Sequence, residues 1–179
     1  LALNDGQVLL DMSLMNRILD FDEDTRQITV EAGTRLVDIF QHVHHRLLTL
    51  PASPTESHSS VAGAIAANVN GKDGWRYGNF SHQVVSLKML LANGELVTLT
   101  PDHELFNAVV GGIGLLGVVV EVTLQLVSIP SNYVEINRIP AANVDALLET
   151  MAEVKKSHNA AVVWVDAYAK GKKIGRSVV

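Results

Sequence analysis

The residues best suited to ligand chemistry lie in one irregular stretch, residues 53–81, where Gly, Ser, Asn and Ala replace most large apolar residues. Within it, Ser57, Ser59 and Ser60 precede a run of small residues, 61–68, that suits one or two tight helical turns. Backbone N–H groups and hydroxyls at such a helix start can bind a phosphate or another anion. An ordinary N-cap cluster uses the same residue types, so both interpretations stand. A serine nucleophile is not expected, because the G-x-S-x-G elbow is absent.

A second loop, Asn70-Gly71-Lys72-Asp73, follows directly after this run. Gly71 has no Cβ and allows the backbone to approach a ligand closely, while its three neighbours supply hydrogen-bond donors and acceptors. A solvated turn would have the same composition. Because long loops inside compact domains are uncommon unless they have a function, the two loops together predict a ligand site.

A glycine-rich turn, residues 112–117, spells G-x-G-x-x-G, the fingerprint of dinucleotide binding. That mechanism needs a strand before the glycines and a helix after them, so that the pyrophosphate lies on the helix N-terminus. Here the order is reversed, with a short helix expected at 104–110 and a strand at 118–127. The acidic residue expected about 20 positions further on is also missing. The Rossmann interpretation is therefore rejected, and the glycines allow either a sharp turn into the strand or the close approach of a ligand.

Composition excludes several classes of protein. The 179 residues include 47% hydrophobic and 18% charged residues, which indicates a globular chain with a core and not a disordered one. The formal net charge of −5 leaves no basic excess for a nucleic-acid partner. Because the chain has no cysteine, disulfides, thiolate metal sites and cysteine nucleophiles are excluded. His42, His44 and His45 lie close together, but no carboxylate motif accompanies them, so we expect no metal site.

The elements that position these loops follow from periodicity and turn signals. The sequence predicts strands at 27–31, 84–91, 96–99 and 118–127 and helices at 36–47, 61–68 and 104–110. Asn93-Gly94 between two apolar strands is a strong hairpin signal. After Pro130 a new pattern begins, with a strand at 133–139, a helix at 141–157 and a strand at 160–167. The mixture predicts an α+β protein with a second unit that starts near residue 131.

Both ends of the sequence run directly into strand-like segments, residues 7–11 at the start and residues 174–179 at the end. We therefore expect a segment of a longer protein, whose true N-terminus lies outside the sequence. The sequence has no basic leader and no apolar run of about 20 residues, so we expect no membrane span. A cytoplasmic location is the expectation that remains.

The order of the motifs resembles the FAD-binding domain of the vanillyl-alcohol oxidase / p-cresol methylhydroxylase family. The matching residues are Ala32-Gly33, Leu50-Pro51, S-V-A-G-A-I-A at 60–66, N-G-K at 70–72, A-N-G-E-L-V at 92–97, E-L-F at 104–106 and V-G-G-I-G-L-L-G-V-V at 110–119. Within that family the chain most resembles decaprenylphosphoryl-β-D-ribose 2-oxidase and related bacterial FAD-linked sugar oxidoreductases. The similarity covers most of residues 1–130 and extends more weakly to Trp164-Val165-Asp166 and Gly175-Arg176-Ser177.

The resemblance implies a bound FAD whose diphosphate is held by two glycine-rich loops, one of them expected to precede Leu1. The implied cofactor-binding residues are Pro54, Thr55, Ser60, Val61, Ala62, Gly63, Asn70, Gly71, Lys72, Asp73, Val118 and Val119. These segments depart from the family's motifs. S-V-A-G stands in place of T-V-G-G, so that Ala62 replaces a glycine, and N-G-K-D stands in place of H-G-K-N, so that Asn70 replaces the histidine. Without that histidine, a proton-transfer role shared with the family is not expected at this position.

By this resemblance the fold is α+β, with an FAD-binding PCMH-type domain of two small sheets and flanking helices at 1–130. The start of a substrate or cap domain follows at 131–179. The implied function is oxidation of an alcohol carbon of a small sugar-like substrate, with hydride transfer to the flavin. Two alternatives stay open: a flavin-free binding module without catalysis, and a UDP-sugar reductase of the related flavin fold. The substrate, the electron acceptor, the catalytic base and the oligomeric state are not determined by the sequence.

Overall fold

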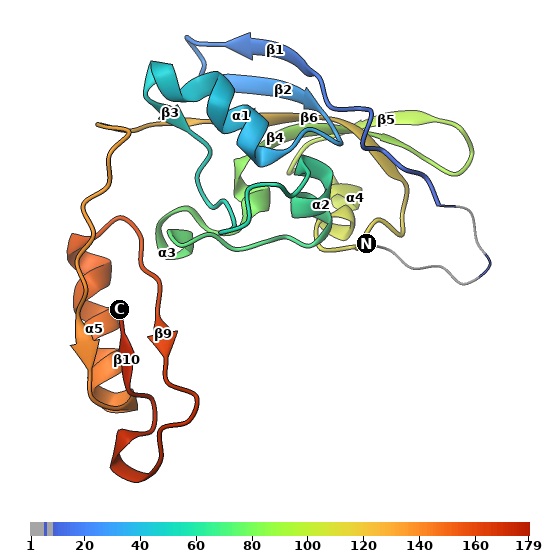
Figure 1. The fold of residues 1–179 in the computed structure, drawn as a ribbon. Coiled ribbons are helices and arrows are strands. Elements are labelled where there is room, and N and C mark those ends of the chain that lie inside the picture. Colours follow the sequence, from blue (N-terminus) through green and yellow to red (C-terminus); the bar gives the residue numbers. More distant parts are fainter. Residues whose placement is uncertain (1–5, 7–8) are drawn as a thin grey trace.

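The structure of the chain is a computed structural model that describes residue 6 and residues 9–179. Two groups of strands and helices follow each other along the chain, and Figure 1 shows the second group projecting away from the first. Residues 1–4 and part of the strand-like run predicted at 7–11 lie outside the described residues. Residues 9–11 form no strand.

The first group is built on one antiparallel sheet of five strands in the order β1-β2-β6-β4-β5. The strands are β1 (Ile18–Asp22), β2 (Gln27–Glu31), β4 (Val84–Leu90), β5 (Leu96–Leu99) and β6 (Val118–Gln125). Hairpins join β1 to β2 and β4 to β5, and β6 pairs with β2 on one side and with β4 on the other. The second hairpin turns at Asn93-Gly94 as predicted, with Gly94 at a φ of 86°. This antiparallel sheet with separate helices confirms the α+β class.

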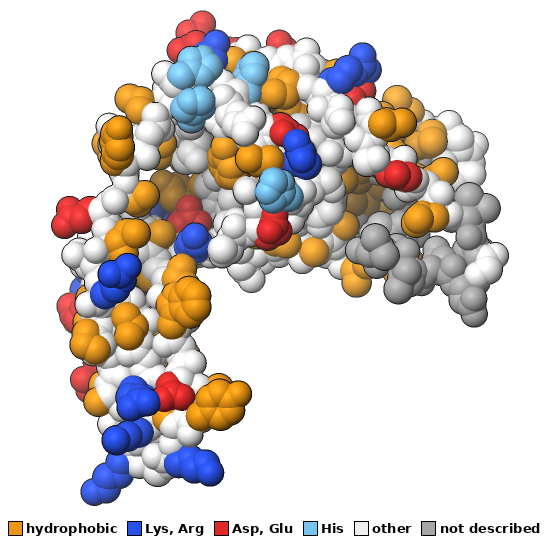
Figure 2. Space-filling model, viewed as in Figure 1, with side chains coloured by type: hydrophobic (Ala, Val, Ile, Leu, Met, Phe, Trp, Pro, Cys, Tyr) orange, Lys and Arg blue, Asp and Glu red, His pale blue; other side chains and the backbone are white. Residues whose placement is uncertain are grey.

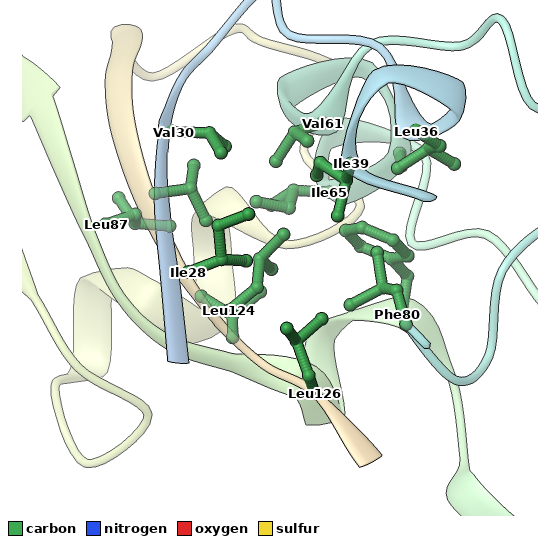
Figure 3. Close-up of a cluster of buried hydrophobic side chains, with 14 of the residues drawn as sticks. Ile28, Val30, Leu36, Ile39, Val61, Ile65, Phe80, Leu87, Leu124 and Leu126 are labelled. Carbon is green, nitrogen blue, oxygen red and sulfur yellow. The ribbon is translucent and has the colours of Figure 1, made fainter. Parts of the chain in front are cut away.

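Short helices cover this sheet and fill its core. They are α1 (Leu36–Val43), α2 (Val61–Ala66), α3 (Gly74–Tyr77) and α4 (Glu104–Val109), with 3-10 turns η1 (His44–Arg46) and η2 (Phe80–Gln83). Figure 3 shows Ile39 of α1 and Ile65 of α2 in the same cluster as Ile28 of the sheet, and all three are fully buried. Helix α1 ends earlier than predicted because the chain reverses at Leu47, which has a left-handed φ of 54°.

A two-stranded ribbon leads out of the first group. It consists of β3 (Leu48–Thr49) and β7 (Val127–Ser128), which pair antiparallel. The first group therefore carries one larger sheet and one short ribbon. The ribbon holds the chain just before Pro130 against the end of η1, where the N–H of Ile129 donates to the carbonyl of Leu47 at 2.9 Å.

The second group is a three-stranded antiparallel sheet with one helix. Its elements are β8 (Pro140–Ala141), α5 (Val144–Ser157), β9 (Trp164–Val165), the 3-10 turn η3 (Gly171–Lys173) and β10 (Ser177–Val178), with the strand order β8-β10-β9. The strand predicted at 133–139 is wrong, and the strand predicted at 160–167 is reduced to β9. Tyr133 and Val134 are 92% and 85% exposed, because β-favouring residues form a strand only where a partner strand lies beside them.

A sharp corner after β2 joins the sheet to α2. The N–H of Ala32 donates to the carbonyl of Val120 on β6, and the carbonyl of Ala32 accepts from Ala62 on α2, both at 3.0 Å. The N–H of Gly33 donates at 2.7 Å to Met15 of the segment that precedes β1. This corner therefore fixes where α2 begins relative to the sheet.

Gly33 tests the tightness of this corner. An added Cβ would overlap the carbonyl oxygen of Met12 and would lie 2.8 Å from that of Met15. We expect Gly33→Ala to lower the free energy of unfolding, measured by urea denaturation, by about 1–3 kcal/mol, the usual cost of overpacking. Gly74→Ala is the matched control, since nothing lies within 4 Å of a Cβ added there. Equal stability of the two variants would contradict the packing role of Gly33.

An ion pair beside the corner holds the N-terminal segment in place. The carboxylate of Glu31, which is only 6% exposed, accepts from the guanidinium of Arg17 at 2.7 Å and from the backbone N–H of Arg17 at 2.8 Å. These hydrogen bonds, the side-chain bond first, hold the pKa of Glu31 below its ordinary value. Glu31 therefore stabilises the fold in its ionised form.

The sign of this pKa shift predicts a pH dependence. The contribution of Glu31 is complete above the ordinary glutamate pKa of about 4.3, and it is lost as the pH falls through the lower value of the folded state. Glu31→Gln should therefore destabilise the chain at pH 7, and its difference from the wild type should shrink toward about pH 3. Urea denaturation at both pH values measures this. The exposed Glu149→Gln is the control and should show no such difference; a gap for Glu31→Gln that stays constant with pH would refute the assignment.

Candidate functional site

The start of α2 is held by the chain itself. Ser60 is the N-cap, and its Oγ accepts from the N–H of Gly63 at 3.2 Å. The N–H of Val61 donates to the carbonyl of Thr34 at 2.9 Å, and that of Ala62 is bonded to the corner described above. Ser60 is thus an ordinary N-cap, and the first amides of α2 already have acceptors. An anion bound at the start of α2 would therefore contact serine hydroxyls and backbone N–H groups that precede Val61.

The outward face of α2 carries only small residues. Gly63 and Ala67 are exposed and Ala66 is half-buried, and a Cβ added at Gly63 would meet only Ser60 Oγ, at 3.0 Å. A flat ligand can therefore approach the backbone of α2 closely.

A narrow groove runs between α2 and the glycine-rich turn 112–117. It has a volume of about 20 Å³, close to that of one water, and is lined by Ala62, Ile65, Ala66, Met89, Val109, Gly112, Gly114, Leu115, Leu116, Gly117 and Val119. Two hydrogen bonds fasten the turn to α2, from Gly111 to the carbonyl of Ile65 at 3.1 Å and from Ile113 to that of Ala66 at 3.0 Å. The turn lies between α4 and β6, so the predicted order of helix, glycines and strand is confirmed and the Rossmann arrangement is excluded.

In the second predicted loop, the glycine serves the chain's own packing. A Cβ on Gly71 would lie 2.5 Å from the carbonyl carbon of Ala52 and 2.6 Å from its Cα. The carboxylate of Asp73 accepts from the N–H of Ala52 at 3.1 Å. The close approach predicted at Gly71 is therefore made by residue 52, and Asp73 is already committed to holding it. Lys72 is exposed and takes part in none of the ion pairs between described residues.

A larger cavity opens between this loop and the second group of elements. Its volume is about 510 Å³. Thr55 and Lys72 line it from the first group, and the second group contributes Val134, Glu135, Ile136, Asn137, Arg138, Ile139, Val154, His158, Ala160, Ala161, Val162, Trp164, Val178 and Val179. Apolar side chains make most of the wall, and Lys72, Arg138, Glu135 and His158 supply charge or titratable groups. A cavity of this size suits a small-molecule ligand.

Two hydrogen bonds tie the facing walls of this cavity together. The N–H of Ala161 donates to the carbonyl of Lys72 at 3.0 Å, and Nη1 of Arg76 donates to Oδ1 of Asn159 at 2.6 Å. The guanidinium of Arg76 also lies over the ring of Tyr77, 5.5 Å from its centroid. The loop after Asn70 therefore forms one wall and is bonded to the other.

The structure does not bring the predicted site residues together in one place. Thr55 and Lys72 line the large cavity, whereas Ala62 and Val119 line the narrow groove. Ser60, Val61 and Gly63 form the start of α2, and Val118 opens β6; Pro54, Asn70, Gly71 and Asp73 line neither space. Sequence reasoning missed Arg138 and His158, which belong to no motif. Trp164, which belongs to the weaker part of the resemblance and was not among the predicted site residues, also lines the large cavity.

The histidine cluster has a structural environment. The ring of His42 packs edge-on against Phe21 with 5.5 Å between centroids, and burial, followed by the charges of Arg46 and His45, lowers the pKa of His42. In the part of the chain that the structure describes, no group of three His, Cys, Asp or Glu residues is arranged to hold a metal ion. Among residues 9–179, no helix has the length and apolar character needed to span a bilayer.

Comparison with known proteins identifies the family. The sequence profile described as "FAD binding domain" matches residues 1–100, and the chain belongs to this family. FAD is therefore its cofactor, and the resemblance inferred from the motifs is confirmed.

The chain is similar to several curated oxidoreductases. It is 31% identical to decaprenylphosphoryl-beta-D-ribose oxidase of Mycolicibacterium smegmatis over 99% of this chain and 40% of that protein. It is 31% identical to L-gulonolactone oxidase of Bos taurus over 92% of this chain and 37% of the relative. L-gulono-1,4-lactone dehydrogenase of Mycobacterium tuberculosis is 36% identical over 71% of the chain and 29% of the relative. The chain thus spans less than half the length of these relatives.

The bonds that cross the large cavity predict a local effect of Arg76. Arg76→Ala should speed amide hydrogen exchange at residues 159–162, because one of the two hydrogen bonds between the walls is lost. The free energy of global unfolding should change by only about 0.5–1.5 kcal/mol, the usual range for one hydrogen bond. Arg35→Ala, which removes an exposed pair with Asp38 on α1, is the control and should leave exchange at 159–162 unchanged. Unaltered exchange in Arg76→Ala would show that the contact does not hold the wall.

Proposed function

We propose that this chain belongs to an FAD-dependent oxidoreductase that oxidises the CH–OH carbon of a small sugar-like molecule. The observation that carries the proposal is the cavity of about 510 Å³ whose walls come from the FAD-binding family region and from the segment after Pro130. The names of two relatives, a ribose oxidase and a gulonolactone oxidase, support a sugar-derived alcohol as the substrate class. A cytoplasmic location remains part of the proposal.

We further infer a division into an FAD-binding domain at 1–130 and the start of a substrate or cap domain at 131–179. The main apolar core supports this division, because its buried members all lie between Ile28 and Leu126. Ala141 and Val154, which are 3% and 4% exposed, are buried outside that core. One contact crosses the proposed boundary: the side chain of Asn132 donates to the carbonyl of His44 in the first group at 3.0 Å.

The nucleotide part of FAD is proposed to lie along α2 and the first residues of β6. Ser60, Ala62 and Gly63 offer a surface without large side chains, and Ala62 and Val119 border the narrow groove. Val61 is fully buried at the start of the same helix, and Val118 directly precedes Val119 on β6. Because the first amides of α2 are bonded within the chain, close contact and shape would dominate over amide hydrogen bonds here. The residues thus fit a flat ligand, which agrees with the family's cofactor.

The substrate and the reactive end of the cofactor are proposed to meet in the large cavity, near Pro54-Thr55 and Asn70 to Asp73. The flavin supplies the hydride acceptor when it is bound. Lys72 is exposed at the cavity without an ion-pair partner among the described residues, and its ammonium favours ligand groups that carry or develop negative charge. Asp73 contributes by holding residue 52, so that the loop keeps its shape.

The walls of the second group define which molecules can enter. Ile136 and Trp164 are 73% and 77% exposed and line the cavity, so they offer apolar surface to a ligand. Arg138 lines the same cavity and adds a permanent positive charge. A substrate with a polar, hydroxyl-bearing part and an apolar part would satisfy both kinds of surface.

The function is tested by anaerobic reduction of the flavin in the longest form of the protein that its gene encodes. The protein should be purified with flavin absorbance and then mixed with aldonolactones, 2-hydroxy acids and phosphorylated or free sugars. Loss of the visible flavin band with one of these alcohols would support the proposal. If none of these compounds reduces the flavin, the result favours a binding module without catalysis. If only NADPH reduces the flavin, the result favours a UDP-sugar reductase.

The proposed position of the nucleotide predicts the effect of bulk at Gly63. Gly63→Val should weaken FAD binding at least tenfold, or about 1.4 kcal/mol, because its side chain would stand on the exposed face of α2. Ala152→Val is the control, because it adds bulk at an exposed position of α5 that the proposed cofactor site does not include. Titration with FAD in the same full-length protein, followed by flavin fluorescence, measures both. Equal affinities of Gly63→Val and Ala152→Val would place the cofactor elsewhere.

A further inference from the structure

The connection between β9 and β10 carries the densest positive charge of the second group. Lys170, Lys172 and Lys173 fall within four residues of one another and are all exposed. None of these lysines takes part in the ion pairs between described residues. The chain as a whole has a net charge of −5, so this local excess stands out against an acidic background.

Apolar side chains stand beside these lysines. Tyr168 is 91% exposed and Ile174 is 58% exposed. Figure 1 places this connection at the end of the second group that lies farthest from the main sheet. Figure 2 shows Lys and Arg side chains gathered at that end, with exposed hydrophobic side chains next to them. The connection is thus a projecting tip that is both basic and apolar.

Hydrogen bonds give the tip a defined shape. Asp166 and Arg176 form an ion pair at its base, and the N–H of Asp166 donates to the carbonyl of Arg176 at 2.8 Å. The N–H of Val144, at the start of α5, donates to the carbonyl of Ile174 at 2.9 Å. Gly171 permits the turn within the tip with a φ of 57°. Because the tip is ordered in this way, its lysines and its apolar side chains are presented together.

We propose that this tip docks onto a bilayer that contains anionic lipids. The ammonium groups of Lys170, Lys172 and Lys173 would lie among the anionic head groups, because a negatively charged membrane surface attracts lysine side chains. Tyr168 and Ile174 would enter the interface between head groups and acyl chains, which suits aromatic and aliphatic side chains. A lipid surface is favoured over a nucleic acid because the phosphate backbone offers nothing for the apolar side chains to enter. A projecting tip also fits a flat, deformable surface better than a groove.

The test is co-sedimentation of the chain with vesicles. The chain should bind vesicles of equal parts phosphatidylglycerol and phosphatidylcholine at low salt, and should bind pure phosphatidylcholine vesicles far more weakly. The variant K170Q/K172Q/K173Q should bind about 100-fold more weakly, at about 1 kcal/mol for each lysine. Added salt should weaken binding of the wild type, because it screens exposed charges. Tyr168→Ser should reduce binding by an amount that salt changes little.

The matched control removes three positive charges elsewhere. K155Q/K156Q/R26Q changes the net charge equally and leaves the tip intact, so it should bind the mixed vesicles within a few-fold of the wild type. Thermal unfolding confirms that each variant is folded. The proposal is overturned if the tip variant and this control bind alike, if the mixed vesicles do not bind the wild type, or if duplex DNA binds the tip more tightly than the vesicles do.

Discussion

The corner that follows β2 is the constraint on which the site depends. Buried backbone N–H and C=O groups need partners, and at this corner the groups of the sheet serve as partners for α2. The carbonyls of Ala32 and Thr34 accept from the first two amides of α2, while the N–H of Ala32 is bonded to β6. The position of α2, and with it the face proposed for the cofactor, is therefore set by the end of one strand. Gly33 is the residue that lets the N-terminal segment pack over this corner.

This arrangement makes the region proposed for the cofactor different from a Rossmann turn. In a Rossmann turn the helix N-terminus keeps its amides free and binds a pyrophosphate through them. Here the amides of Val61 to Gly63 donate to acceptors within the chain, and the glycine-rich turn at 112–117 is hydrogen-bonded to α2 and leads into β6. What the chain offers is a helix whose exposed face has small residues and a groove bordered by glycines. The G-x-G-x-x-G fingerprint alone would therefore have assigned a Rossmann arrangement that this turn does not have.

The sequence predicts an element correctly where the pattern that specifies it lies within a few neighbouring residues. The hairpin at Asn93-Gly94, strand β2 and the small-residue helix α2 follow from turn chemistry and periodicity over a few residues. The strand predicted at 133–139 fails because strand formation depends on a partner edge, which no local pattern contains. The missing Cβ of Gly71 predicts the close approach of a ligand, whereas residue 52 of the chain itself occupies that space. The large cavity is also out of reach of local patterns, because it joins Thr55 and Lys72 to residues more than 60 positions further along the chain.

The two walls of the large cavity differ in the chemistry that they contribute. On the wall from the first group, Asn70 has no titratable side chain, and the carboxylate of Asp73 is committed to the N–H of residue 52. Lys72 gives this wall a positive charge. Among the residues that line the cavity, the carboxylate of Glu135 and the imidazole of His158 are the candidate proton acceptors for the proposed oxidation, and both belong to the second group. The region proposed to bind the cofactor thus offers surface and positive charge, and the wall that follows Pro130 adds a carboxylate and an imidazole.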